Sequence, residues 1–253
     1  LVPGRLQHVD PLVERLVEET DAVLNFAAES HVDRSIEGSE AFVSTNVQGT
    51  RTLLDAARKH DIERFAQIST DEVYGEVESG KFHEDDPLNP RNPYAATKAS
   101  ADLLAKSYFV THDIPVVMTR SSNNLGPRQH PEKLIPKFVQ RANDGETLEL
   151  YGDGTNVREW LFVDDNCRAI DRVLRRGECG EVYNIGSGVE LQNIEVARKI
   201  VQAVGATEEL IEFVQDRAGH DQRYALDTTK IEGLGWEPTT TFEEGLQRTV
   251  RYY

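Results

Sequence analysis

The stretch "ISTDEVYG" at residues 68–75 decides how the rest of the chain is interpreted. It begins as a buried strand would, as the end of the segment "RFAQIST" (64–70). It then places Asp71 and Glu72 side by side before a Tyr-Gly turn. Neighbouring carboxylates disfavour each other's charge, so a strand end beside a core is a poor place for a purely structural pair. The pair therefore fits either a solvated turn after a strand or chemistry that needs both an acid and a base.

Short apolar runs alternate with longer helical patterns around this stretch. Strands are expected at 22–28, 64–70 and 115–122, and helices at 39–61 and 92–113. The run "AVLNFAA" (22–28) is nearly continuous, as is typical of a strand covered on both faces. Asn92 is expected to cap the second helix, with Pro93 at its first position. This alternation predicts an α/β fold with a Rossmann-type, doubly wound parallel sheet.

Beyond residue 125 the pattern changes to a proline-rich segment, a helix through about residue 144, and short strands. The strands are expected at 148–152, 158–163 and 181–186, with a helix opened by Asp164 or Asp165 between the last two. Thr241, with Glu244 three residues later, predicts the capping box of a final helix. We therefore expect a dinucleotide-type domain at 1–125. A smaller C-terminal α/β lobe follows at 126–253, with some chain crossing back to the first sheet.

The composition excludes several classes of protein. The net charge of −16, from 44 acidic and 28 basic residues, argues against nucleic acid and against an anionic membrane surface as partners. The sequence has no apolar run long enough to span a membrane, and its start lacks a signal-peptide pattern. Two cysteines and seven histidines lack metal-ligand spacing, so no metal is expected and a cytoplasmic location is the default. The acidic excess fits either a high-salt cytoplasm or an ordinary acidic protein.

A dinucleotide fold normally opens with a glycine-rich turn that places the pyrophosphate on a helix N-terminus. Neither G-x-G-x-x-G nor G-x-x-G-x-x-G occurs in the 253 residues. The chain instead enters with the helix-like "PLVERLVEETD" (11–21) and proceeds directly into the strand at 22–28. We expect that the chain begins after that motif, and that without it these residues bind a dinucleotide poorly.

Tyr94 and Lys98 stand four residues apart at the start of the helix at 92–113, so they share one face. A lysine ammonium near a phenol favours the phenolate, which predicts a lowered pKa and an acid–base role for Tyr94. The spacing alone also fits a half-buried Tyr with a solvated Lys. The preceding "ISTDEVYG" strand favours the catalytic interpretation.

Taken together, these motifs resemble the extended short-chain dehydrogenase/reductase family, and within it the dTDP-glucose 4,6-dehydratases. The similarity runs nearly the full length in order, through "FAAESHVDRSI" (26–36), "STDEVYG" (69–75), "NPYAATKAS" (92–100), "SNNLGP" (122–127), "PEKLIP" (131–136), "YGDGTNVREWLFVDD" (151–165), "YNIGSG" (183–188) and "AGHDQRYALD" (218–227).

The resemblance implies an NAD-dependent reaction. Oxidation at C4 of the sugar makes the C5 hydrogen acidic, water then leaves from C5–C6, and the hydride returns to C6. Tyr94 would take the C4 hydroxyl proton with help from Lys98 and Thr70, Asp71 would be the general acid, and Glu72 the general base. An epimerase needs no such carboxylate pair, and the pKa values of two close carboxyls are expected to be pushed apart, with one staying protonated.

The resemblance also implies further binding residues. Those for the cofactor are Ala27, Ala28, Glu29, Thr45, Tyr94, Lys98 and Asn124. Those for the nucleotide sugar are Ser30, Thr70, Asn123, Lys133, Leu134, Tyr151, Arg158, Asn193, Arg217 and His220. Guanidinium forks suit phosphate oxygens, although Arg158 and Arg217 could equally be ordinary surface ion pairs. His31 is expected to pack or hydrogen-bond rather than to catalyse.

Rival interpretations are a nucleotide-sugar 4-epimerase or decarboxylase of the same family, a dehydratase using another nucleotide, and a catalytically silent member. "TDE" (70–72) speaks against the epimerase and decarboxylase. Retention of all four of Asp71, Glu72, Tyr94 and Lys98 speaks against a silent protein. The resemblance further implies a homodimer through the helices at 39–60 and 92–112.

Overall fold

A four-stranded parallel sheet organises the first part of the chain. The computed structural model describes residues 11–253. Residues 1–10 lie outside the described part. The start of the first predicted domain and the segment checked for a signal peptide fall within these ten residues. The strand order is β1-β2-β3-β7, and every pair is parallel. The strands are β1 (Ala22–Asn25), β2 (Arg64–Thr70), β3 (Val116–Ser121) and β7 (Val182–Ile185). The predicted α/β class is confirmed.

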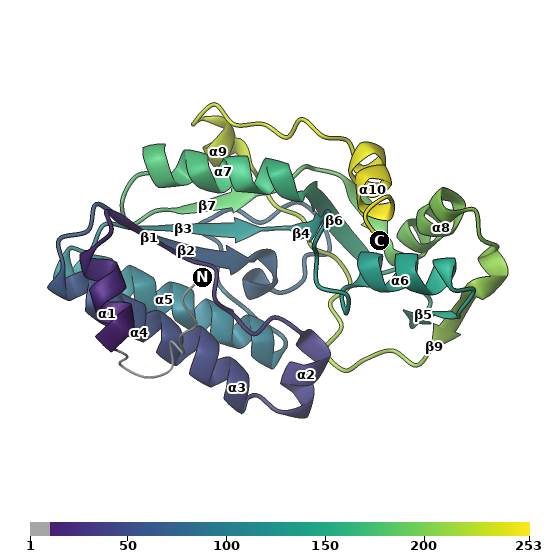
Figure 1. The fold of residues 1–253 in the computed structure, drawn as a ribbon, viewed down its shortest axis with the longest axis horizontal. Helices are drawn as coiled ribbons and strands as arrows, with labels where there is room; N and C mark the ends of the chain where they lie inside the picture. Colours follow the sequence, from purple (N-terminus) through teal and green to yellow (C-terminus); the bar gives the residue numbers. More distant parts are fainter. Residues whose placement is uncertain (1–10) are drawn as a thin grey trace.

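Helices cover both faces of this sheet (Figure 1). One face carries α1 (Pro11–Glu18), α4 (Gly49–Lys59) and α5 (Pro93–His112), and the other carries α7 (Val163–Arg176) and α9 (Thr229–Glu232). Side chains alternate between the two faces along each strand. Phe65 and Met118 accordingly join the core with α1, α4 and α5, whereas Ala66 and Val117 join the core with α7 and α9.

A second group of elements forms its own core. It contains a three-stranded sheet, a two-stranded parallel sheet and three helices. These are β4 (Asn123–Leu125), β6 (Val157–Phe162) and β8 (Glu190–Gln192); β5 (Leu148–Tyr151) and β9 (Ile211–Val214); and α6 (Leu134–Asn143), α8 (Asn193–Val204) and α10 (Phe242–Val250). Phe138, Trp160 and Ile200 are among the residues buried between them.

Short helical segments complete the structure. They are α2 (Val32–Glu37), α3 (Glu40–Phe42), a π-helical segment (Val43–Gln48), and two 3₁₀ turns at Asp71–Tyr74 and Glu208–Leu210. The helix expected at 39–61 is thus a continuous α3–π–α4 run. None of the described helices is long and apolar enough to cross a membrane.

Two local predictions are wrong. The strand at 22–28 ends at Asn25 and is not covered on both faces, because Leu24 is 39% exposed and Phe26 is 56% exposed. Among the described residues β1 pairs only with β2, so it is an edge strand. The helix α7 is not capped by an aspartate, because it begins at Val163 and places Asp164 and Asp165 in its first turn.

The predicted caps of the other two helices are confirmed. The Asn92 side chain accepts the backbone N–H of Ala95 at 2.8 Å, and Pro93 is the first helical residue of α5. Thr241 and Glu244 form the capping box of α10. Each cap satisfies backbone N–H groups that would otherwise lack partners at a helix start. The start of α5, which carries Tyr94, is therefore firmly defined.

Candidate active site

The two carboxylates lie on a single 3₁₀ turn where β2 ends. The Thr70 hydroxyl accepts the backbone N–H of Glu72 at 3.4 Å and so caps the turn Asp71–Tyr74. Gly75 ends it with a φ of 82°, and a Cβ atom there would lie 2.5 Å from the carbonyl oxygen of Asn89. The turn therefore requires glycine on both conformational and steric grounds.

Asp71 and Glu72 occupy different environments although they are neighbours. The side chain of Asp71 is 2% exposed and its Oδ1 accepts the Thr70 hydroxyl at 3.1 Å, while its Oδ2 has no partner among the described residues. Burial, reinforced by the charges of Glu72 and Glu159, raises the pKa of Asp71 well above its usual value. Asp71 therefore carries a proton at pH values where an ordinary aspartate has lost it.

Glu72 faces a pocket and is only half buried. Its Oε2 accepts a hydrogen bond from the Asn92 side-chain amide at 3.2 Å. Because the other end of that amide caps α5, one residue links Glu72 to the start of the helix that bears Tyr94. The carboxylate is thus held in place and remains accessible from the pocket.

The expected lowering of the Tyr94 pKa by Lys98 is wrong. Burial, with the nearby Glu72 carboxylate, raises the pKa of the Tyr94 phenol. The Thr70 side chain opposes this shift by hydrogen bonding to Tyr94. Lys98 is also buried, which lowers the pKa of its ammonium, and its Nζ donates to the carbonyl of Ile68 at 2.6 Å. Both side chains nevertheless lie on the buried face of α5, as their spacing predicts.

A pocket of about 350 Å³ brings many of the predicted residues together. Nine of them line it: Glu72, Asn123, Lys133, Leu134, Tyr151, Arg158, Asn193, Arg217 and His220. They come from the 3₁₀ turn at Asp71–Tyr74, from β4, β5, β6, α6 and α8, and from connecting loops, so only the tertiary fold brings them to one place. Buried atoms without a partner among the described residues include Asn123 Oδ1, Asn193 Oδ1 and Arg217 Nε. Such atoms indicate a site that takes a polar ligand.

We name two groups of residues at this site. The strand-end cluster comprises Thr70, Asp71, Glu72, Tyr94 and Lys98, and the cationic cluster comprises Lys133, Arg158, Arg217 and His220. In the second group, Arg158 donates to the carbonyl of Asp221 at 2.9 Å, and its guanidinium lies over the Tyr224 ring, 4.4 Å from the ring centre.

Burial affects the protonation of two members of the cationic cluster, Lys133 and His220. Lys133 donates to the Ser30 carbonyl at 2.5 Å, and burial lowers the pKa of its ammonium. Burial and the Arg217 charge lower the pKa of His220 to about 4. His220 is therefore neutral at pH 7 and offers hydrogen bonds rather than charge, with its Nδ1 2.7 Å from Asp216 Oδ1.

The remaining predicted residues lie outside the pocket lining, mostly along the strand ends and the adjoining loops. Ala27, Ala28, Glu29 and Ser30 follow β1, and the Glu29 N–H donates to the Asn46 side chain at 2.8 Å. Thr45 lies beside Asn46 in the π-helical segment. Asn124 donates to the Ser122 carbonyl at 3.1 Å, and its Oδ1 is buried without a partner among the described residues.

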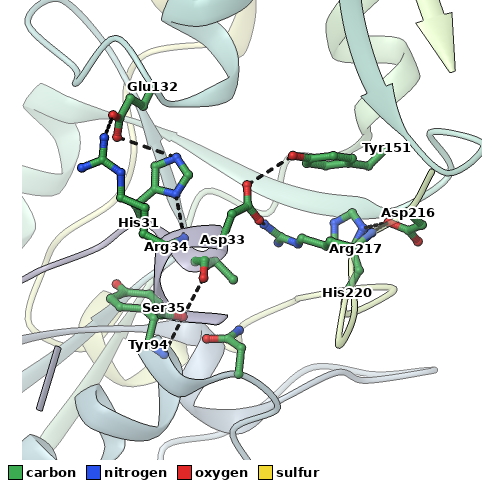
Figure 2. A network of polar contacts seen from close by, with 12 residues as sticks. His31, Asp33, Arg34, Ser35, Tyr94, Glu132, Tyr151, Asp216, Arg217 and His220 are labelled. Carbon is green, nitrogen blue, oxygen red and sulfur yellow. Dashed lines mark hydrogen bonds and ion pairs between the residues drawn. The ribbon is translucent and has the colours of Figure 1, made fainter. Parts of the chain in front are cut away.

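Sequence reasoning missed several residues of the pocket wall, chiefly on α2 and around residue 132. Figure 2 shows Asp33 beside Tyr151 and Arg217, and Glu132 beside His31 and Arg34. His31 caps α2 by accepting the Arg34 N–H at 3.5 Å, which agrees with the hydrogen-bonding role expected for it. The only available signal for Asp33 was its position three residues after Ser30, in a loop that leaves a strand end.

A parallel α/β sheet whose strand ends present a Tyr/Lys pair, a carboxylate pair and a polar pocket defines an enzyme of the dehydratase and epimerase class. The sequence model of the family described as GDP-mannose 4,6 dehydratase matches residues 4–249. The chain belongs to this family. It is an enzyme, a hydro-lyase, as its similarity to curated dehydratases establishes.

Two curated relatives illustrate the similarity. The chain is 69% identical over 242 residues to the low-salt glycan biosynthesis protein Agl12 of Haloferax volcanii, covering 96% of this chain and 78% of the relative. It is 52% identical over 240 residues to a dTDP-glucose 4,6-dehydratase of Streptomyces griseus, covering 94% of this chain and 73% of the relative.

Solved structures agree. DesIV, a dTDP-glucose 4,6-dehydratase from Streptomyces venezuelae solved with NAD bound, superposes with a TM-score of 0.97 at 51% identity, over 99% of this chain and 78% of that one. A UDP-glucose 4-epimerase from Thermus thermophilus in complex with NAD superposes with a TM-score of 0.93 at only 30% identity, over 98% of this chain and 83% of that one. The sequence is therefore more similar to these dehydratases than to this epimerase.

Proposed function

We propose that the chain converts dTDP-glucose to dTDP-4-keto-6-deoxyglucose with NAD as a recycled cofactor. The observation that carries the proposal is the Asp71–Glu72 pair, one carboxyl buried with a raised pKa and its neighbour facing the pocket. Relatives at about half identity bear the name of this dehydratase.

The strand ends suit the nicotinamide half of NAD. Tyr94 and Lys98 lie on the helix that follows β2, and the unpartnered amide oxygen of Asn124 belongs to the segment just after β3. Both segments leave the carboxyl ends of sheet strands, where α/β sheets bind nucleotides. No glycine-rich turn for the pyrophosphate occurs in the 253 residues. When bound, NAD supplies the hydride acceptor for C4 and the hydride donor for C6.

The strand-end cluster would move the protons. Tyr94, hydrogen-bonded by Thr70, accepts the proton of the C4 hydroxyl as the phenolate, and the ammonium of Lys98 on the same helix would balance the charge of that phenolate. Glu72 removes the C5 proton, exchanges it with solvent and later delivers a proton to C5, whereas Asp71 donates its proton to the departing C6 hydroxyl. The sugar therefore loses one water molecule, and the cofactor returns to its starting form. The proton gained by Tyr94 replaces the one given up by Asp71.

The cationic cluster would hold the nucleotide diphosphate. Arg158 and Arg217 supply guanidinium groups, which match phosphate oxygens in geometry and charge. Lys133 adds an ammonium, and the neutral His220 adds a hydrogen bond. Ser30, Leu134, Tyr151, Asn123 and Asn193 complete the proposed substrate set, and Ala27, Ala28, Glu29 and Thr45 the cofactor set.

Mass spectrometry of the nucleotide sugar after incubation with dTDP-glucose and NAD tests the proposal. Loss of one water without net NADH is the expected result. An unchanged mass with conversion to the galactose isomer would make the enzyme a 4-epimerase. An unchanged substrate, alongside turnover of another nucleotide sugar, would reassign the nucleotide.

We further propose that the product enters glycan assembly in the cytoplasm. The support is the name of the relative at 69% identity, together with two exposed free thiols, Cys167 and Cys179, which a reducing compartment keeps unpaired. Deletion of the gene would then remove a deoxysugar from the cell's glycans. An unchanged glycan composition would refute this assignment.

We also propose a homodimer that pairs the helices at 39–60 and 92–112. Val43, Leu103 and Val110 project from these helices with large exposed apolar side chains, 62% exposed at Leu103 and 67% at Val110. Burial of such side chains is a main source of association energy. Light scattering should give twice the 28.5 kDa monomer mass, and Leu103→Glu should lower it to the monomer value.

The division into a cofactor domain at 1–125 and a substrate lobe at 126–253 is likewise a proposal. The pocket residues of the cationic cluster all lie after residue 125, and the strand-end cluster lies before it. Strand β7 and helices α7 and α9 belong to the first sheet although they follow residue 125.

A further inference from the structure

Asp33 places a carboxylate beside a guanidinium of the pocket, that of Arg217. It is the second residue of α2, and it contacts Tyr151, the last residue of β5, and Arg217, which follows β9. Its Oδ1 is 3.2 Å from Arg217 Nη1, and its Oδ2 accepts the Tyr151 hydroxyl at 3.3 Å (Figure 2). Both oxygens of one carboxylate therefore engage side chains proposed to bind the substrate.

A carboxylate in a pocket for a diphosphate would ordinarily weaken binding, because like charges repel. Its position here gives it a different effect. Holding one nitrogen of a planar guanidinium fixes the direction of the remaining donors. Arg217 Nε is buried and has no partner among the described residues, so it is free to serve a ligand.

The backbone of Arg217 is fixed separately. Asp216 Oδ1 accepts the Arg217 N–H at 2.8 Å and lies 2.7 Å from His220 Nδ1. Asp216 thus holds the loop, whereas Asp33 holds the guanidinium itself. Loss of Asp33 would leave the loop intact and release the side chain.

We propose that Asp33 is a positioning residue that orients Arg217 and Tyr151 to receive the diphosphate of a nucleotide sugar. The inference rests on the proposed function, because it assumes a nucleoside diphosphate in the pocket. It deepens that function by assigning a role to a carboxylate that touches no reacting atom.

A second bridge from the same helix offers a matched control. Arg34, next to Asp33 on α2, forms an ion pair with Glu132 on the other side of the pocket but does not contact Arg217. Arg34→Gln therefore loosens α2 without releasing the arginine. If Asp33 acts only by anchoring α2, the two substitutions should have the same effect.

The experiment measures dTDP affinity by calorimetry, with kcat and KM for dTDP-glucose, in the unsubstituted chain and in Asp33→Asn, Arg34→Gln, Arg217→Gln and the Asp33→Asn/Arg217→Gln double variant. Asp33→Asn should raise Kd and KM about tenfold, or about 1.4 kcal/mol, and change kcat less than about twofold. Arg34→Gln should bind dTDP as the unsubstituted chain does. The double variant should lose less affinity than the sum of the two single losses, because Asp33 acts largely through Arg217 and otherwise only through Tyr151.

Unchanged or tighter dTDP binding by Asp33→Asn would overturn the inference and leave the proposed function standing. Equal losses in Asp33→Asn and Arg34→Gln, or additive losses in the double variant, would also overturn it. Absence of dTDP binding by the unsubstituted chain would instead remove the proposed function itself. Urea unfolding curves of each variant identify any loss that comes from the fold.

Discussion

The strand-end cluster buries groups whose charged forms are disfavoured, whereas the cationic cluster pairs its guanidinium groups with carbonyl and carboxylate oxygens. Asp71 and Tyr94 are buried at the end of β2 and the start of α5, and burial raises the pKa of both groups, which keeps the acid Asp71 protonated and makes the phenolate of Tyr94 a strong base. Arg158 and Arg217 place their guanidinium groups beside carbonyl and carboxylate oxygens. One pocket thus separates an end built for proton transfer from an end built for anion binding. Substitutions at the first should affect kcat, and at the second KM.

Tyr94→Phe provides the strongest test of this separation. Loss of the phenolic oxygen should lower kcat by about 10⁴-fold, the upper range for a proton-transferring group, and leave dTDP affinity unchanged. Tyr74→Phe is the matched control, because Tyr74 is equally buried but bonds Arg120 and Asn184 away from the pocket. That change should cost about 1–3 kcal/mol of unfolding free energy and spare kcat. A Tyr94→Phe enzyme of normal kcat would contradict the assignment.

Glu72→Gln should reduce water loss by about 10³-fold, again with little change in dTDP affinity. The physical reason is that the amide keeps the hydrogen bond to Asn92 but cannot accept the C5 proton. Reactions run in D₂O and followed by mass spectrometry report the step directly, since C5 should no longer take up solvent deuterium. Continued uptake would exclude Glu72 as the base.

Arg158→Lys tests the other end of the pocket. The buried guanidinium of Arg158 spans the Asp221 carbonyl and the Tyr224 ring, and an ammonium cannot reproduce that planar fork. We expect KM and the dTDP Kd to rise about tenfold, with kcat nearly unchanged. A variant that loses kcat and keeps KM would show that the two ends are not separable.

The stability of Asp71→Asn, measured apart from its activity, shows the smallest expected effect and reveals the cost of the buried acid. Because the folded pKa of Asp71 lies above the unfolded value of about 3.9, its stabilising contribution is complete below that pH and declines as the pH rises through the folded pKa. Asparagine does not titrate. Urea unfolding should therefore show the variant gaining stability relative to the unsubstituted chain as the pH rises from 4 to 8. An equal pH dependence in both proteins would mean that Asp71 ionises freely.

The sequence predicted the elements whose signals are local. Apolar periodicity located α5 and β2, and the residues Asn92 and Thr241 located two helix starts, because a cap depends on only three or four neighbouring residues. The same kind of reasoning failed at α7, where Asp164 and Asp165 look like caps. The Asp165 carboxylate instead accepts the backbone N–H groups of Thr239 and Thr240, which lie far along the chain.

Properties set by the tertiary environment were harder to predict. The four-residue spacing of Tyr94 and Lys98 correctly placed both on one face of α5, but it could not reveal that burial and Glu72 would raise the phenol's pKa. Asp33 escaped notice because its partners Tyr151 and Arg217 are more than a hundred residues away. Side chains a few residues apart can be placed together from their sequence spacing. Contacts between side chains that are distant in the sequence require either the fold or a family resemblance.

The way β7 enters the sheet has a consequence for folding. The chain leaves the first sheet after β3, builds β4, β5 and β6 elsewhere, and only then returns to pair β7 with β3. The four-stranded sheet can therefore be completed only after β4, β5 and β6 have been made, and a cut near residue 125 would separate β3 from its neighbour β7. Non-local pairing of this kind slows folding. The protein should unfold in one cooperative transition and refold slowly, with the two halves lost and regained together.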